Sequence, residues 1–181
     1  MGSEAPPAVT IHFTGFKKFH EVSENPTEII VRQGALPTLY QTMQSKKTIW
    51  VHFGVYSDAI TFAIEQQAVN EATFDFPDEL GWQPHQVPIV PADGGITHVR
   101  KTSLPVEEIR EALSKKGFEV MTSDNAGQFV YNYVYYQSLH FAEQNGTKSL
   151  FVHMPPFLVM DEETQMQFVV SLLEVLASLC Q

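Results

Sequence analysis

The chain has 181 residues, is 44% hydrophobic and 12% aromatic, and carries a formal net charge of −10. This length and composition fit one domain with its own core and exclude a disordered chain. The acidic balance argues against nucleic acids and anionic membranes as partners. No apolar segment has membrane-spanning length and residues 1–7 carry no secretion signal, so we expect a cytoplasmic protein with a disordered start over 1–7.

Cysteine and histidine usage bears on metal and redox chemistry. The single cysteine, Cys180, permits neither a disulfide nor a cysteine-based zinc site. It lies at the end of the last expected helix, where a structural thiol is the expected role. The histidines show no spacing typical of metal ligands. The sequence therefore predicts no metal and no cofactor.

Two apolar runs in the first half of the chain predict strands. Residues 8–13 form the first, which continues into the sequence TGFKKF at 14–19. Residues 48–55 form the second and are nearly all apolar, which is typical of a parallel-sheet strand buried on both faces. Between the two runs, Pro26 suits the first position of a helix, and Gly34 interrupts the pattern soon afterwards.

The second half alternates between helices and strands after a long irregular segment. Residues 73–102 are rich in proline, glycine and aspartate and are expected to form a connecting loop. Ser103 is the expected N-cap of the next helix, and Gly117 closes it. The expected helices span 103–116, 128–143 and 161–179, and the expected strands span 117–121 and 149–153. This alternation predicts a single three-layer α/β/α domain, 1–181, with a mostly parallel or mixed sheet.

The junction between strand 117–121 and the following helix has the sequence SDNAGQFVYNYVYY, from Ser123 to Tyr136. Asn125 and the two residues after it predict a tight turn that leads into a helix N-terminus. The free N–H groups and the positive dipole end of such a helix suit a nucleophile and an oxyanion. A later strand carries His153 just ahead of two prolines.

These two stretches resemble the pyroglutamyl peptidase type I family, cysteine peptidases that remove N-terminal pyroglutamate. The family pattern is Ser-x-x-Ala-Gly-x-Phe/Tyr-Val/Leu-Cys-Asn/Asp-x-x-x-Tyr, followed by Phe-Val/Ile-His-Val/Ile-Pro. The chain matches this pattern at Ser123, Ala126, Gly127, Phe129, Val130, Asn132, Tyr136, Val152, His153 and Pro155. Where the family has its nucleophilic cysteine, the chain has Tyr131.

The resemblance implies roles for further residues. In the family a histidine deprotonates the cysteine and a glutamate orients the histidine, and these roles fall on His153 and Glu65. Val55 stands where bacterial members have a glutamine that contacts the substrate. The implied substrate-binding positions are Phe16, Phe19, Val55 and Asn70, the two phenylalanines as walls of the pyroglutamyl pocket.

The chain also departs from the family in its first half. The segment 14–19 lacks the Gly-Pro that the family has between its two aromatic residues. The turn at 56–58 lacks the family's glycines, which puts close approach of the backbone to a ligand in question. The span from Phe16 to His52 is shorter than in the family, so we expect a truncated N-terminal half.

Tyr131 separates two hypotheses about function. A thiol with a pKa of about 8.5 is a few per cent ionised at neutral pH, whereas a phenol with a pKa of about 10 is ionised to roughly one part in a thousand. The first hypothesis is a degenerate family member that keeps Glu65 and His153, lacks peptidase activity and binds a pyroglutamyl peptide or a similar small ligand. The second is an active hydrolase that uses Tyr131 or an activated water with His153 and Glu65. Because family members form dimers or tetramers, the resemblance is also compatible with a homo-oligomer.

Overall fold

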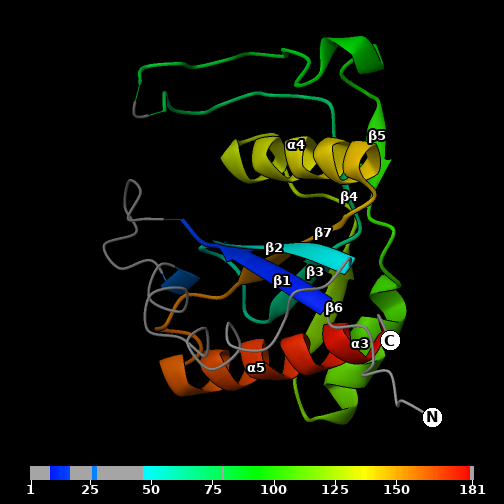
Figure 1. Ribbon diagram of the computed structural model, residues 1–181. Coiled ribbons are helices and arrows are strands. Elements are labelled where there is room, and N and C mark those ends of the chain that lie inside the picture. Colours follow the sequence, from blue (N-terminus) through cyan, green and yellow to red (C-terminus); the bar gives the residue numbers. More distant parts are fainter. Residues whose placement is uncertain (1–8, 17–25, 28–46, 79, 180–181) are drawn as a thin grey trace, which may run out of the picture.

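The computed structural model describes residues 9–16, 26–27, 47–78 and 80–179 (Figure 1). Its elements are the strands β1 (Val9–Thr14), β2 (Lys47–Val55), β3 (Phe62–Glu65), β4 (Gln67–Val69), β5 (Val99–Lys101), β6 (Val120–Ser123) and β7 (Lys148–Met154), the helices α3 (Val106–Lys115), α4 (Val130–Asn145) and α5 (Glu162–Leu179), and a 3₁₀ helix (Pro91–Asp93). No helix within these ranges is long and apolar enough to cross a membrane. Residues 1–7, Phe19, Gly34, Cys180 and most of the segment expected to be truncated lie outside the described residues.

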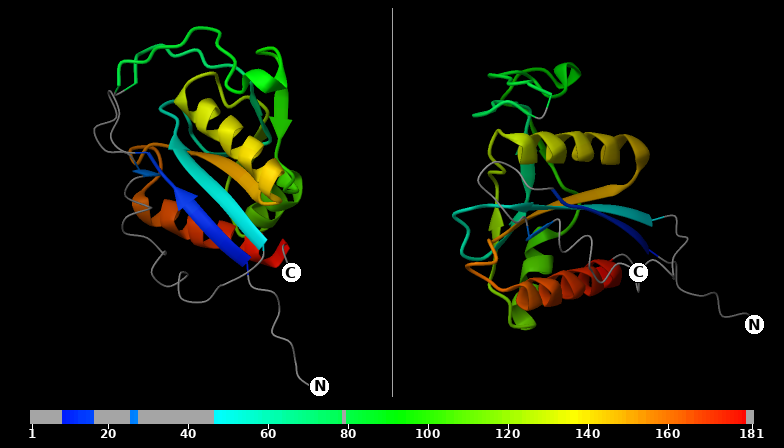
Figure 2. Two further views of the ribbon diagram at one scale, coloured as in Figure 1. Left: turned by 45° about the horizontal axis from the view of Figure 1, so that its top comes forward. Right: turned by 90° about the vertical axis from the view of Figure 1, so that its left-hand side faces the viewer.

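A five-stranded sheet with the order β1-β2-β7-β3-β6 forms the middle layer. β1, β2 and β7 run parallel, β3 runs antiparallel to β7, and β6 is parallel to β3. Helix α4 covers one face of the sheet, and α3 and α5 cover the other (Figures 1 and 2). The expected three-layer α/β/α fold with a mixed sheet is confirmed.

The central strand β7 is buried from Ser149 to Met154 because each of its faces meets a helix layer. Leu150 and Val152 belong to the core that the sheet shares with α3 and α5, where Phe62 of β3 stacks on Phe168 of α5 with 3.6 Å between ring centroids. Phe151 points the other way, into a second core beneath α4. A residue of β7 on the same face as Phe151 therefore faces α4, and this places the functional side chains.

A local polar contact shifts the start of the helix that was expected to begin at Ser103. The helix starts at Val106, and Ser103 is not its N-cap. Thr102 Oγ1 accepts a hydrogen bond from the Leu104 amide at 3.2 Å, and this turn delays the start of the helix. The helix ends as expected, because Gly117 adopts the positive φ of 97° that glycine tolerates best.

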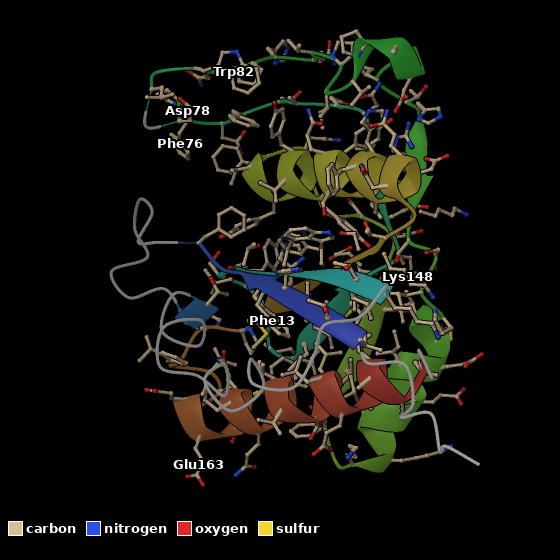
Figure 3. All side chains as sticks on the ribbon, in the orientation of Figure 1. Phe13, Phe76, Asp78, Trp82, Lys148 and Glu163 are labelled. Carbon is tan, nitrogen blue, oxygen red and sulfur yellow. The ribbon has the colours of Figure 1, made fainter. Side chains whose placement is uncertain are left out.

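The segment 73–102, expected to be one connecting loop, is partly regular. It contains β5, which pairs antiparallel with β4 to form a separate two-stranded sheet. The rest of the segment extends above α4, and Figure 3 shows Phe76, Asp78 and Trp82 on it. Trp82 contacts Tyr133 of α4 with 5.6 Å between ring centroids, so aromatic packing holds this part against the helix.

A chain of side-chain hydrogen bonds attaches α4 to the sheet. Thr14 Oγ1 lies 2.6 Å from His52 Nδ1, and His52 Nε2 lies 2.7 Å from Ser138 Oγ. Ser138 Oγ lies in turn 2.8 Å from Ser149 Oγ. Burial lowers the pKa of His52 to about 4, so its ring is neutral near pH 7 and can both donate and accept a proton in this chain.

Candidate active site

The acid–histidine pair implied by the resemblance forms at the centre of the sheet. Glu65 ends β3 and lies opposite Phe151 of β7, so its side chain shares the α4 face with Phe151 and His153. Glu65 Oε1 is 2.8 Å from His153 Nδ1, and the two residues are only 2% and 7% exposed. A carboxylate can only accept, so Nδ1 carries the proton and donates it. Nε2 is then the basic atom, and it receives no hydrogen bond from the described residues.

Tyr131, the second residue of α4, fills the space next to this pair. Its ring makes edge contacts with His153 and Phe16, with ring centroids 5.4 and 4.7 Å away, and a tilted contact with Phe151 at 5.7 Å. Gly54 of β2 makes room for the ring, because a Cβ atom at this position would lie 3.1 Å from Tyr131 Cδ1 and 2.8 Å from Phe151 Cζ. The aromatic ring thus occupies the gap between the start of α4 and the histidine.

The phenol of Tyr131 is held in its neutral form. Burial raises the pKa of Tyr131 to about 12, an effect that a hydrogen bond from the Val55 backbone partly offsets. At neutral pH this pKa leaves about one phenol in 10⁵ ionised. Val55 is only 4% exposed. Its contact with the site is this backbone hydrogen bond to the Tyr131 phenol.

Asn70 directly follows β4 and is fully buried. Its Oδ1 accepts a hydrogen bond from the Val90 amide at 2.8 Å, and its Nδ2 donates to the Val90 carbonyl at 3.1 Å. The same Nδ2 approaches the carbonyls of Gly94 and Gly95 at 3.5 and 3.4 Å. Asn70 thus anchors the loop ahead of β5, and its implied contact with substrate stays a prediction.

Replacing Asn70 with alanine is expected to lower the free energy of unfolding by about 2 kcal/mol, because the buried amide and carbonyl of Val90 lose their partners. Urea denaturation of the native chain and the variant measures this loss. The exposed Asn125→Ala variant is the matched control and should lose less than about 1 kcal/mol. Equal losses at the two positions would contradict the anchoring role.

Sequence reasoning found the acid–histidine pair but missed several residues around it. Phe151 could have been inferred, since it lies two residues before His153 on a strand and so shares its face. The sequence around Gly54 gives no sign of its role. A glycine is needed there because Tyr131 and Phe151, which are distant in the sequence, pack where a side chain would lie. Of the implied site, Glu65, His153, Tyr131, Phe16 and Val55 come together, and Phe19 lies outside the described residues.

A second polar cluster supports the far end of α4. Arg100 makes a two-pronged ion pair with Asp93, both N···O distances being 2.7 Å, and also pairs with Glu143. The Tyr136 hydroxyl donates to Asp93 at 2.5 Å, and the guanidinium of Arg100 holds the pKa of Asp93 well below its usual range. Among the described residues, no group of histidine, cysteine and acidic side chains could hold a metal ion.

Comparisons with known proteins agree with this geometry. A family model described as pyroglutamyl peptidase matches residues 31–177. The pyrrolidone-carboxylate peptidase of Klebsiella pneumoniae is 30% identical, with 78% of this chain and 76% of that protein covered, and that of Pyrococcus furiosus is 29% identical, with 78% of each covered. The structure of a mutant pyrrolidone carboxyl peptidase from Pyrococcus furiosus is 25% identical and matches with a TM-score of 0.78 over 92% of this chain and 97% of that one.

A mixed sheet that carries a buried acid–histidine pair beside a helix N-terminus defines a peptidase-like α/β protein. With the family model covering most of the chain and relatives matching along most of their length, the chain belongs to the pyroglutamyl peptidase family.

Proposed function

We propose that this chain is a pyroglutamyl peptidase-like protein without peptidase activity, because Tyr131 replaces the nucleophilic cysteine. The family reaction implied by the resemblance is hydrolytic removal of N-terminal pyroglutamate. The observation that carries the proposal is the packing of the Tyr131 ring against His153 and Phe16. A side chain in this place both lacks a thiol and occupies the space that a scissile bond needs beside the histidine.

The chemistry of the phenol supports the same conclusion. A nucleophile must reach its ionised form, and burial raises the pKa of Tyr131 to about 12. The phenol oxygen also lies at the far end of a rigid ring, well beyond the place of a cysteine sulfur on the same backbone. The first turn of α4 therefore presents no ready nucleophile to a carbonyl carbon.

The alternative function is hydrolysis of pyroglutamyl or related amides by Tyr131 or by a water activated by His153 and Glu65. One observation favours the water route: the Glu65–His153 hydrogen bond of 2.8 Å is intact, and Nε2 has no hydrogen-bond partner among the described residues. This pair retains the geometry of a general base.

Release of a fluorescent amine from a pyroglutamyl substrate tests these functions. We expect no turnover above buffer for the native chain, and none for Tyr131→Phe or His153→Ala. Native turnover that disappears in Tyr131→Phe would establish a tyrosine nucleophile. Turnover that survives in Tyr131→Phe and disappears in His153→Ala would establish the water route.

The proposed ligand is a pyroglutamyl peptide or a similar small molecule, bound next to Phe16 and Phe19. The support is the family's substrate class and the position of Phe16 at the edge of the site. Because the Tyr131 ring now contacts Phe16, such a ligand must displace the ring before it binds. A cytoplasmic location, inferred from the sequence, and a homo-oligomeric state, implied by the family resemblance, complete the proposal.

A further inference from the structure

The two-stranded sheet of β4 and β5 has an edge that faces a cleft. His98 and Thr102 flank β5, and their backbones bond those of the residues that flank β4: the Asn70 amide donates to the His98 carbonyl at 2.8 Å, and the Thr102 amide donates to the Gln66 carbonyl at 3.0 Å. Arg100 lies midway between them, opposite Ala68 of β4. Antiparallel ladders bond every second residue. Val99 and Lys101 therefore direct their N–H and C=O groups away from β4, toward the open edge.

The opposite edge of the same sheet shows how such groups are satisfied. The Val69 amide of β4 donates to Asn132 Oδ1 at 2.9 Å, and Asn132 Nδ2 donates to the carbonyls of Val69 and Glu71 at 2.9 and 3.0 Å. The Asn132 amide thus pairs with β4 as a neighbouring strand would. Within the described ranges, no group pairs in this way with the backbone of Val99 or Lys101.

A cleft of about 480 Å³ runs along this open edge. It is lined by residues 98–101 and Ser103 at and around β5, by Leu139, Ala142 and Glu143 of α4, and by Thr147 and Ser149 around the start of β7. Figure 1 places β5 beside the C-terminal end of α4, and Lys148 in Figure 3 marks the start of β7 on the same side. Tyr131 lies at the other end of α4, so this cleft is separate from the candidate active site.

The shape and polarity of the cleft suit an extended chain. Leu139 and Ala142, both at most 5% exposed, form a small apolar wall. Thr147 Oγ1 in the same wall is buried without a hydrogen-bond partner from the described residues. A peptide strand beside β5 would pair its backbone with Val99 and Lys101 and turn alternate side chains toward this wall.

Charge indicates what kind of peptide fits. Arg100 is paired with two carboxylates, those of Asp93 and Glu143, whereas Lys101 is exposed and makes no ion pair with the described residues. The cleft thus offers a free ammonium group on a chain of net charge −10. We propose that the cleft binds an extended acidic peptide segment of a partner protein by strand addition to β5. This proposal does not depend on whether the chain has peptidase activity.

Selection of a displayed library of short random peptides on the full chain supplies the probe. The variant Val99→Pro removes one outward-facing N–H and leaves the ladder to β4 intact, since proline is tolerated on edge strands. We expect acidic peptides to be enriched on the native chain and not on Val99→Pro. A selected peptide, titrated by fluorescence anisotropy, should bind Val99→Pro about tenfold or more weakly.

Two further measurements test the proposal even if Val99→Pro does not fold. N-methylation of alternate peptide amides should weaken binding to the native chain by a similar factor, because it removes backbone donors without changing the protein. Lys101→Glu should weaken binding about two- to fivefold at low salt, an effect that added salt removes. Enriched peptides that bind Val99→Pro or tolerate N-methylation equally would overturn the proposal, as would no enrichment. Concentration-dependent dimerisation abolished by Val99→Pro would also overturn it, because the edge would then pair with a second copy.

Discussion

Replacing Tyr131 with cysteine is expected to give the chain hydrolysis of pyroglutamyl amides, at a rate about 10³-fold or more above the native chain. The change removes the ring that packs on His153 and Phe16 and leaves a small thiol at the N-terminus of α4. A thiol beside a histidine and a helix N-terminus is readily ionised, whereas the native phenol, with a pKa of about 12, is not. The same fluorescent-amine assay measures the gain.

Two variants show whether such a gain comes from the intended site. Tyr133→Cys places a thiol on the same helix, at a position where the native tyrosine packs against Trp82. This variant should show no activity. Adding His153→Ala to Tyr131→Cys should abolish the gained activity, because the thiol loses its base. A folded but inactive Tyr131→Cys protein would show that the changes at 56–58 and before His52 have also dismantled the pocket.

Acidification is expected to destabilise the fold through His52 by about 3 kcal/mol. The ordinary pKa of histidine is 6.5, and burial lowers the pKa of His52 in the folded chain to about 4. Between these values the unfolded chain binds more protons, so stability is fully present above about pH 6.5 and is lost as the pH falls toward 4. Protonation also removes the acceptor that the ring contributes to its chain of hydrogen bonds with Thr14 and Ser138.

Urea denaturation at about pH 7 and about pH 4.5 measures this effect. His52→Gln keeps hydrogen-bonding groups but cannot titrate, so its stability should change less between the two pH values. His85 is exposed, and His85→Gln should retain the full native pH dependence. An unchanged pH dependence in His52→Gln would rule out His52 as the source.

Local sequence patterns determined the α/β alternation, the central buried strands and the motif from Ser123 to Pro155 that carries the family resemblance. These features could be read from the chain because each depends on neighbouring residues: hydrophobic periodicity, a glycine at a helix end, or a fixed spacing of motif residues. The pairing of Glu65 with His153 was also expected, but from the family resemblance and not from local sequence patterns.

Tertiary structure decided the features that join distant segments. The antiparallel insertion of β3 beside β7 brings Glu65 to His153, 88 residues later in the chain. The contact of Tyr131 with Phe16 and the open edge of β5 likewise arise from packing between elements. Strand order and ring packing depend on which buried surfaces come into contact, and the local propensity of a segment does not determine this. The sequence, through the family resemblance, thus pointed to Tyr131, and the fold determined that its ring packs against His153 and Phe16.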